Sequence, residues 1–205
     1  MAAPNDTSAS ERAERIFREH GGILRTGEAL EAGIHPRTLY ALRDAGRIER
    51  LARGLYRLTA AEPSANPDLL TVAARIPKGV GCLVSALAFH QITTQIPHAV
   101  DLALPKGAWK PRLEHPPLRT YRFSGKAMTE GVETHDISHV NVRIFSAEKT
   151  LADCFKFRHK IGLDIALEAL RMYWRRSRAD VSAITRFAEI DRVTAVMRPY
   201  LEAML

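Results

Sequence analysis

Cysteine, long hydrophobic runs and a cleavable leader are scarce or missing in this chain of 205 residues. Its two cysteines, Cys82 and Cys154, lie far apart among apolar neighbours and form no CxxC pair, so we expect buried thiols in a reducing cytoplasm, without a disulfide. The longest nearly apolar run, Val80 to Phe89, is far shorter than the ~18 residues of a membrane helix, so we expect no membrane contact. Residues 1–10 are small and polar, which does not fit a secretory signal, and we expect a disordered tail there.

Motifs of catalysis and cofactor binding are also missing. The sequence holds no Walker loop and no GxGxxG fingerprint, and Ser85 and His90 lack the glycines of a nucleophile elbow. His135 and His139 would lie roughly 13 Å apart on an extended strand, too far to share one metal ion. We therefore expect no catalytic residue, no metal and no cofactor.

One pair of residues resembles a fragment of a nuclease signature. Glu148 and Lys149 follow each other without the residue that such a motif needs between acid and lysine, and Asp136 does not complete it. An acidic residue in the first turn of a helix stabilises the helix dipole, which is a simpler role for Glu148.

Positive charge is abundant, and it is concentrated. The chain carries a formal net charge of +7, which favours polyanionic partners such as nucleic acid. Residues 34–60 contain six arginines against Asp44 and Glu49, whereas residues 1–33 are slightly acidic. The alternative that these two acids hold arginines in ion pairs would reduce the charge available to a ligand.

A break in composition divides the chain. Residues 60–67 combine two prolines with small polar residues, which is typical of an interdomain linker. We therefore expect a first domain over residues 11–60, a linker over residues 61–67 and a second domain over residues 68–205.

The first domain has the pattern of a winged helix-turn-helix. We expect a helix over Glu11 to His20, a helix over Thr26 to Ala32 with Thr26 as its N-cap and with Ala29 and Leu30 facing inward, and a third helix that begins at Pro36. Residues 47–58 then alternate apolar and charged side chains around a glycine turn, which predicts a basic hairpin. Three short helices and a hairpin in this order indicate a DNA-binding module.

The expected DNA contacts follow from the direction of the third helix. If Leu39 and Leu42 face the core, then Arg37, Thr38 and Tyr40 point outward near the start of the helix, the end that reaches base edges. Further arginines are assigned to phosphates, which set affinity and register. They are Arg43, Arg47, Arg50 and Arg53. The alternative is a small helical subdomain with solvated arginines.

The second domain predicts a small sheet followed by helices, which makes the whole chain an α+β protein. We expect helices over residues 68–75 and 82–90. Strands are expected over residues 100–104, 118–124, 132–137 and 140–145, with a turn at Ser138 and His139 between the last two. Later helices are expected to be capped by Ser146, Asp180 and Asp191.

A second basic surface is expected in this domain. Six cations against the single acid Glu114 are interleaved with Trp109, His115 and Tyr121 over residues 105–126, and they suit either nucleic-acid phosphates or an acidic protein partner. The cations are Lys106, Lys110, Arg112, Arg119, Arg122 and Lys126.

These residues together resemble a known family. The segments Ile23 to Tyr40, Gly46 to Ile48 and Arg53 to Arg57 are similar to the N-terminal winged helix of AbiEi-type antitoxins, which belong to type IV, abortive-infection toxin-antitoxin systems. Ser85 to His90, Leu104 to Gly107 and above all Phe145 to Arg158 resemble the second domain of the same family.

The resemblance implies a bacterial cytoplasmic antitoxin that takes part in phage defence. Its first domain would bind inverted repeats of double-stranded DNA in its own promoter and repress the operon, as a monomer or a weak dimer. Its second domain would antagonise an AbiEii-type nucleotidyltransferase toxin without forming a stable complex. Two rival functions are a nuclease that uses the winged helix for targeting and a protein-protein adaptor.

Overall fold

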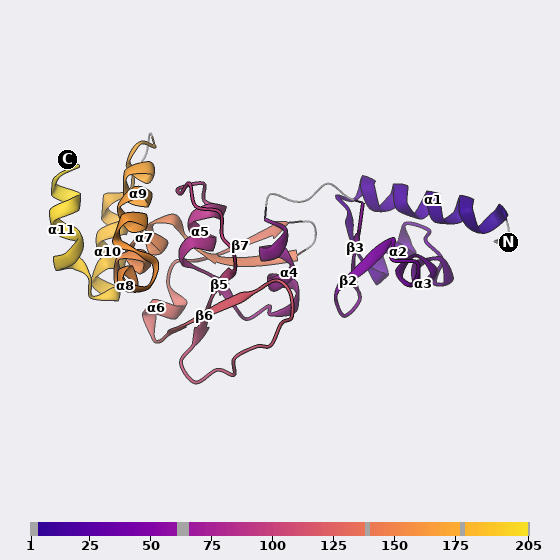
Figure 1. The fold of residues 1–205 in the computed structure, drawn as a ribbon, viewed down its shortest axis with the longest axis horizontal. Helices are drawn as coiled ribbons and strands as arrows, with labels where there is room; N and C mark the ends of the chain where they lie inside the picture. The colour runs from indigo at the N-terminus through magenta and orange to yellow at the C-terminus, as the bar shows by residue number, and fades with distance from the viewer. Residues whose placement is uncertain (1–3, 61–65, 138–139, 177–178, 205) are drawn as a thin grey trace. The chain divides into compact units, whose positions relative to one another are not determined.

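The computed structural model of the chain describes residues 4–60, 66–137, 140–176 and 179–204 (Figure 1). Contacts divide it into two compact units, one formed by Met1–Arg75 with Asp136–Asn141 and the other by Ile76–His135 with Val142–Leu205. The domain boundaries expected from the sequence stay a prediction, because most of the linker, residues 61–65, lies outside the described residues.

The first unit contains the predicted order of helices and hairpin (Figure 1). Its elements are α1 (Pro4–Glu19), β1 (Ile23–Arg25), α2 (Thr26–Glu31), α3 (Pro36–Asp44), β2 (Ile48–Ala52), β3 (Leu55–Leu58) and α4 (Pro67–Arg75). The three strands form an antiparallel sheet in the order β1-β3-β2, which adds β1 to the expected hairpin. Helix α4 groups with this unit by its contacts, although the sequence placed it at the start of the second domain.

Helix α1 is longer than the sequence predicted. It begins at Pro4, so most of the segment expected to be a disordered tail is helical. Proline tolerates the first turn of a helix, and residues 5–10 contain neither glycine nor a second proline to end it. The predicted end is confirmed: Gly21 and Gly22 have positive φ angles, and the Gly22 amide donates to the Phe17 carbonyl over 2.7 Å.

A small hydrophobic core supports α3. Leu39 and Leu42 are buried, as predicted, and they pack with Phe17 of α1 and Tyr56 of β3. The prediction that Leu30 faces inward is wrong, because Leu30 is 42% exposed. A helix of six residues buries one narrow face, which in α2 is occupied by Ala29, and the next residue is turned by about 100° away from it.

The second unit is a mixed sheet followed by helices, which confirms the predicted α+β fold. Its elements are β4 (Val80–Gly81), α5 (Leu83–Phe89), β5 (Val100–Pro105), β6 (Leu118–Phe123), α6 (Lys126–Thr129), β7 (Val132–Ile137), β8 (Val140–Phe145), α7 (Ala147–Lys156), α8 (Arg158–Ile161), α9 (Leu163–Trp174), α10 (Val181–Asp191) and α11 (Thr194–Glu202). The strand order is β6-β5-β4-β8-β7; β4 pairs antiparallel with β5 and parallel with β8, and β5 pairs parallel with β6. The turn predicted at Ser138 and His139 lies outside the described residues.

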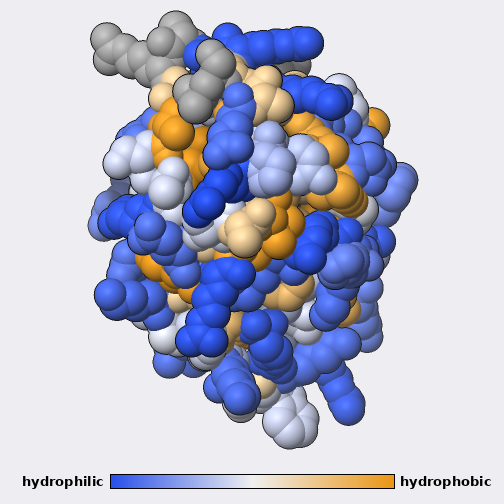
Figure 2. All heavy atoms as spheres, turned by 90° about the vertical axis from the view of Figure 1, so that its left-hand side faces the viewer, coloured by the Kyte–Doolittle hydropathy of each residue, from blue (hydrophilic) through white to orange (hydrophobic). Residues whose placement is uncertain are grey.

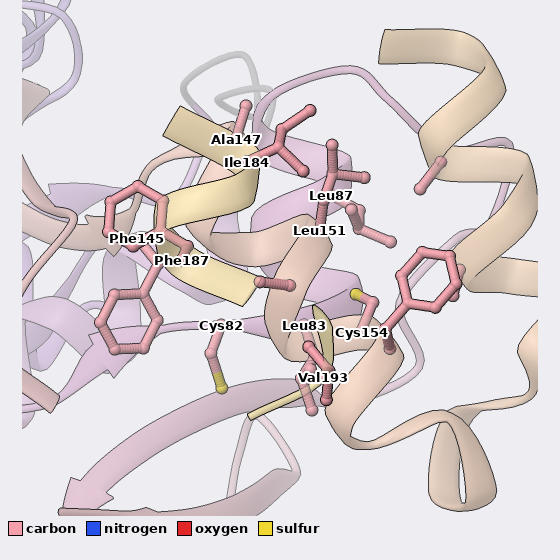
Figure 3. Close-up of a cluster of buried hydrophobic side chains, with 14 of the residues drawn as sticks. Cys82, Leu83, Leu87, Phe145, Ala147, Leu151, Cys154, Ile184, Phe187 and Val193 are labelled. Carbon is pink, nitrogen blue, oxygen red and sulfur yellow. The ribbon is translucent and has the colours of Figure 1, made fainter. Parts of the chain in front are cut away.

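The core of this unit is formed by α5, β8, α7 and α10, whose side chains meet in Figure 3. Leu87 of α5, Leu151 of α7 and Phe187 of α10 are all buried there. The prediction of two buried free thiols is confirmed, since Cys82 and Cys154 are buried and unpaired by a disulfide. Desolvation raises the pKa of both thiols, which keeps them protonated.

Helix α7 also brings charge into the core, which the sequence did not predict. The ammonium of Lys149 is fully buried; it contacts Asp153 one turn later and lies 2.9 Å from the Asp191 carboxylate of α10. Lys156 approaches the other Asp191 oxygen to 3.1 Å. The prediction that Asp191 caps the last helix is wrong, because Asp191 is the last residue of α10 and pairs with these lysines. Ser146 and Asp180 cap α7 and α10 as predicted.

The last helices form an apolar hollow at the surface. A pocket of about 320 Å³ is lined by Leu167 and Trp174 of α9 and by Tyr200 of α11, with Arg171 and Arg175 beside them. The face built by these helices shows hydrophobic patches between hydrophilic side chains (Figure 2). In the described part of the chain, no helix has the length and apolar character needed to cross a membrane.

Candidate nucleic-acid interface

Helix α3 presents the residues that the sequence assigned to base recognition. Its N-terminus is fixed by Pro36 in the first turn and by His35, whose Nδ1 accepts a hydrogen bond from the Arg37 amide over 3.2 Å. With Leu39 buried beneath the helix, Arg37 is exposed and Tyr40 is 44% exposed. A helix N-terminus with outward polar side chains has the geometry of a recognition helix.

Thr38 lies between the two exposed side chains and is half-buried. Its position one residue before the buried Leu39 turns it partly toward the rest of the unit. It can therefore contact a phosphate or a methyl group only along one side of the helix.

The hairpin of β2 and β3 is the predicted wing, and it is tied to the start of α2. The Thr26 amide donates to the Gly54 carbonyl over 2.8 Å, and the Thr26 hydroxyl donates to the same oxygen over 3.3 Å. Thr26 was expected to cap α2, but Arg25 occupies the N-cap position and the Arg25 amide donates to Glu28 over 2.7 Å. Thr26 thus anchors the wing and does not cap the helix.

Glycine is required at the tip of the wing. Gly54 has a φ of +70°, a conformation that side chains with a Cβ rarely adopt, and a Cβ there would lie 3.4 Å from the Thr26 hydroxyl. This turn places Arg53, which precedes Gly54, at the exposed end of the hairpin.

Several of the predicted phosphate-binding arginines are held by acids. Arg43 lies 2.7 Å from the Asp44 carboxylate and stacks over the Tyr40 ring at 5.1 Å. The hydrogen bond that Arg43 donates to Asp44 raises the pKa of Arg43. Arg47 pairs with Glu14 of α1, which is almost fully buried.

The alternative left open for Asp44 and Glu49, that they hold arginines in ion pairs, is confirmed. Asp44 holds Arg43, and Glu49 accepts from the Arg57 guanidinium over 2.7 Å. Both pairs are largely exposed, and exposed pairs stabilise a protein by about 0 to 1 kcal/mol, so a phosphate can replace the carboxylate at small cost.

Three predicted arginines keep their charge available. Arg37 and Arg53 are exposed and form no ion pair within residues 4–60. Arg50 of β2 is also exposed and donates only to a neutral carbonyl, that of Ala52, over 3.2 Å. Among the predicted DNA-contacting arginines, those at the start of α3 and on the wing therefore keep a charge that no acid offsets within residues 4–60.

The second predicted surface lies in the other unit, around the loop between β5 and β6. Its six cations are all exposed, and Trp109 in the loop is 85% exposed. His115 is exposed as well, whereas Tyr121 is buried in the core of the unit. Tyr121 therefore does not contribute to this surface, because it lies on the covered face of β6.

The residue pairs that resembled active-site fragments have other partners. The Ser85 hydroxyl accepts from the Asp101 amide over 2.9 Å, and His90 Nε2 lies 2.7 Å from the Phe145 carbonyl. Glu148 accepts a hydrogen bond from the Tyr173 hydroxyl. Burial, and after it this hydrogen bond, raises the pKa of Tyr173 to about 12.

The structure describes the surroundings of His135 but not those of His139. His135 lies 3.0 Å from the Glu133 carboxylate, and His139 lies outside the described residues. Within the described ranges, no group of three or more His, Cys, Asp or Glu side chains is arranged to hold a metal ion.

Comparison with known proteins places the first unit in a family context. Residues 11–59 match a family model described as "Transcriptional regulator, AbiEi antitoxin". No curated protein sequence matches the chain.

Solved structures share the fold. The chain is similar to the crystal structure of the RV2827C protein from Mycobacterium tuberculosis, with a TM-score of 0.55 and 13% sequence identity over 98% of this chain and 82% of that one. At this identity the likeness concerns the fold alone. The family match, in contrast, confirms the resemblance inferred from the residues of the first unit, and it does not cover the second unit.

Proposed function

We propose that the chain is a DNA-binding repressor of its own operon and the antitoxin of a type IV toxin-antitoxin system. The observation that carries the proposal is the exposed, N-terminally capped helix α3 beside a cationic wing, within a segment that matches a regulator family. Helix α3 would enter the major groove, and the wing would follow the adjacent backbone.

Arg37 is assigned to base recognition. It stands at the first turn of α3, is exposed and is not held by an acid in residues 4–60, so its guanidinium is free to donate two hydrogen bonds to a guanine edge. Tyr40, one turn further along, and Thr38 would contact a phosphate or a thymine methyl group.

Arg53 and Arg50 are assigned to phosphates. Both lie on the wing, where side chains meet the backbone of the duplex rather than its base edges. Their loss would weaken binding to all sequences about equally and would reduce the salt dependence.

Arg43 and Arg47 are assigned to phosphates with smaller effects. Arg43 must leave Asp44 to bind a phosphate, which is inexpensive for an exposed pair. Arg47 is bound to Glu14, which Arg18 also approaches to 3.1 Å, and removing Arg47 would leave a buried carboxylate with one partner fewer. We therefore expect Arg47 to affect stability as well as binding.

The experiment is a titration of the full-length protein with labelled duplex DNA from upstream of its own reading frame. Fluorescence anisotropy at several salt concentrations compares Arg37→Ala and Arg53→Ala with Arg186→Ala, an exposed arginine on α10. We expect the first two to lose affinity and the control to keep it. Unchanged binding in both Arg37→Ala and Arg53→Ala would contradict the assignment.

The antitoxin role is inferred from the resemblance of Phe145 to Arg158 to the second domain of the family and from the family match of residues 11–59. We propose that the second unit antagonises an AbiEii-type nucleotidyltransferase toxin in the bacterial cytoplasm without forming a stable complex. Co-expression with an AbiEii-type nucleotidyltransferase toxin should restore growth, and affinity purification should recover no stoichiometric complex. A variant with Arg37 and Arg53 replaced should lose repression but keep the rescue.

The proposed role requires no catalytic step of the chain itself. Incubating the purified protein with DNA, RNA and a divalent metal ion tests the rival nuclease function. Metal-dependent cleavage that is abolished by Glu148→Gln or Asp136→Asn would contradict the proposal.

A further inference from the structure

The second unit carries a cationic surface that the proposed duplex interface does not use. It consists of the loop of residues 106–117 and the exposed cations that follow it on β6 and α6, and we call it the loop surface. Its members are Lys106, Trp109, Lys110, Arg112, Arg119, Arg122 and Lys126.

Topology places this loop at an edge of the sheet. Strands β5 and β6 are parallel, with Val100 opposite Leu118 and Pro105 opposite Phe123, and β6 is the edge strand. The chain must therefore return from the carboxyl end of β5 to the amino end of β6, and the loop makes this return without regular structure.

The beginning of the loop is fixed to the sheet. The Lys106 amide donates to the Phe123 carbonyl over 2.8 Å, and the Arg122 guanidinium donates to the Pro105 carbonyl over 3.3 Å. Lys106 and Arg122 are thus neighbours at one end of the edge strand.

Trp109 is presented to solvent on this loop. Its side chain is 85% exposed, whereas Trp174, the other tryptophan of the chain, is half-buried on α9. Lys106 and Lys110, both exposed, lie three residues before it and one residue after it in the sequence, so the indole is presented on a cationic stretch of the loop. Ile96, which is 81% exposed in another loop, has no cation within three residues.

The charge of the loop surface is not offset by acids. Among the described residues, none of its six cations forms an ion pair, and Glu114 is the single acidic residue between residues 105 and 126. Arg119 acts on the buried Asp101 across the strand pair, and this attraction partly opposes the effect of burial on the pKa of Asp101. Because side chains alternate along a strand, Arg119 lies on the face of β6 opposite to Arg122, so it takes no part in the contact proposed below.

We propose that the loop surface binds single-stranded nucleic acid, with Trp109 stacked on an unpaired base and Lys106, Lys110 and Arg122 on the phosphates beside it. An exposed indole finds no free base face in a duplex, where bases stack on one another, whereas single strands offer one at every nucleotide. Lysine contacts phosphates readily but is depleted at the cores of protein-protein interfaces. One tryptophan on an irregular loop also offers little apolar area for a protein partner.

The first experiment uses Trp109 as its own reporter. In full-length protein with Trp174→Phe, the fluorescence of Trp109 is followed while a 16-nucleotide oligo-uridine RNA, the corresponding oligo-thymidine DNA, a duplex of the same length or polyglutamate is added. We expect saturable quenching by one or both single strands, and the two arms distinguish RNA from DNA. Absent quenching by both, or equal quenching by the duplex or by polyglutamate, would overturn the proposal.

The second experiment measures affinity by anisotropy of the labelled single strand. Trp109→Ala should weaken binding about 5- to 150-fold, the range that base stacking contributes, and Trp109→Phe should retain most of the affinity. Lys106→Ala and Lys110→Ala should each reduce the slope of log affinity against log salt by about 0.7. Ile96→Ala is the matched control, and an equal loss in this variant would refute a specific role for Trp109.

The inference is independent of the duplex interface, and the same variants separate the two. Arg37→Ala should leave single-strand binding unchanged, and Trp109→Ala should leave binding to operator DNA unchanged. If Trp109→Ala weakened both equally, the loop surface would be an extension of the duplex site and the proposal would be wrong.

Discussion

Replacing Lys149 by methionine tests the buried charge network of α7 in the second unit. The substitution keeps the length and most of the volume of the side chain but removes the ammonium that lies between Asp153 and Asp191. It therefore leaves the packing nearly intact, while two buried carboxylates lose the ammonium group that they share.

The structure gives the expected size of this loss. Lys149 and both carboxylates are fully buried, Asp153 Oδ2 already lacks a hydrogen-bond partner, and only Lys156 remains near Asp191 after the change. Removing one partner of a buried ion pair destabilises a protein by about 3 to 5 kcal/mol. The ammonium also lies 4.8 Å from the centre of the Phe145 ring, a further attraction that methionine replaces only in part.

Urea unfolding followed by circular dichroism measures the effect. We expect the free energy of unfolding of the second unit to fall by about 3 to 5 kcal/mol in Lys149→Met. In the triple variant with Lys149→Met, Asp153→Leu and Asp191→Leu, most of this loss should be recovered, because no unpaired charge remains buried. A loss below about 1 kcal/mol in the single variant would refute the reasoning.

The pH dependence gives a second readout of the same variant. Burial raises the pKa of Asp153, and Lys149 opposes this rise. The folded state therefore already binds a proton at Asp153 more tightly than the unfolded state, whose pKa is about 3.9, and removing the lysine increases this difference. The destabilisation should therefore be largest at neutral pH and should shrink as the pH falls toward the unfolded pKa, about 3.9. A pH-independent difference would contradict this explanation.

Two further predictions concern other buried groups. Leu39→Ala should lower the free energy of unfolding of the first unit by about 2 to 5 kcal/mol in urea, because Leu39 is fully buried beneath α3. Leu30→Ala, at an exposed position, should change this free energy by less than about 0.5 kcal/mol. Equal effects of the two substitutions would contradict the described core. Burial raises the pKa of Asp101 to about 6, so the stability that it contributes is present below pH 4 and is lost as the pH rises through 6. Asp101→Asn should remove this dependence from unfolding curves between pH 4 and 7, and a persistent dependence would argue against the burial of this carboxyl.

Local patterns were sufficient to predict much of the fold. Proline at the start of α3, glycine after α1 and at the wing, and the alternation in β7 and β8 are signals that act through the backbone within a few residues. The buried face of α3 followed in the same way from the spacing of Leu39 and Leu42.

The missed features depend on partners that are distant in sequence. Thr26 is a good N-cap residue by type, but its amide is taken by Gly54, 28 residues away. Asp191 resembles a cap for the same reason, yet Lys149 attracts it from 42 positions earlier. The segment around Glu148 and Lys149 was compared with a nuclease fragment, and the structure shows Lys149 and Asp153 joining α7 to α10.

The candidate interface was predictable in its residue types but not in its available charge. Counting arginines did not distinguish Arg37 and Arg53, which acids leave free in the described part of the first unit, from Arg43 and Arg47, which Asp44 and Glu14 hold. Glu14 lies on α1, more than 30 residues before Arg47, so this pairing required the tertiary structure.

The most direct test of the central claim is the salt-dependent titration of Arg37→Ala and Arg53→Ala against operator DNA and against operators with single base changes. We expect Arg37→Ala to cost about 1 to 3 kcal/mol and to lose discrimination at one base pair. Arg53→Ala should weaken binding to all duplexes similarly and lower the salt slope by about 1. Equal affinity of wild type and both variants for every duplex, at every salt concentration, would contradict it.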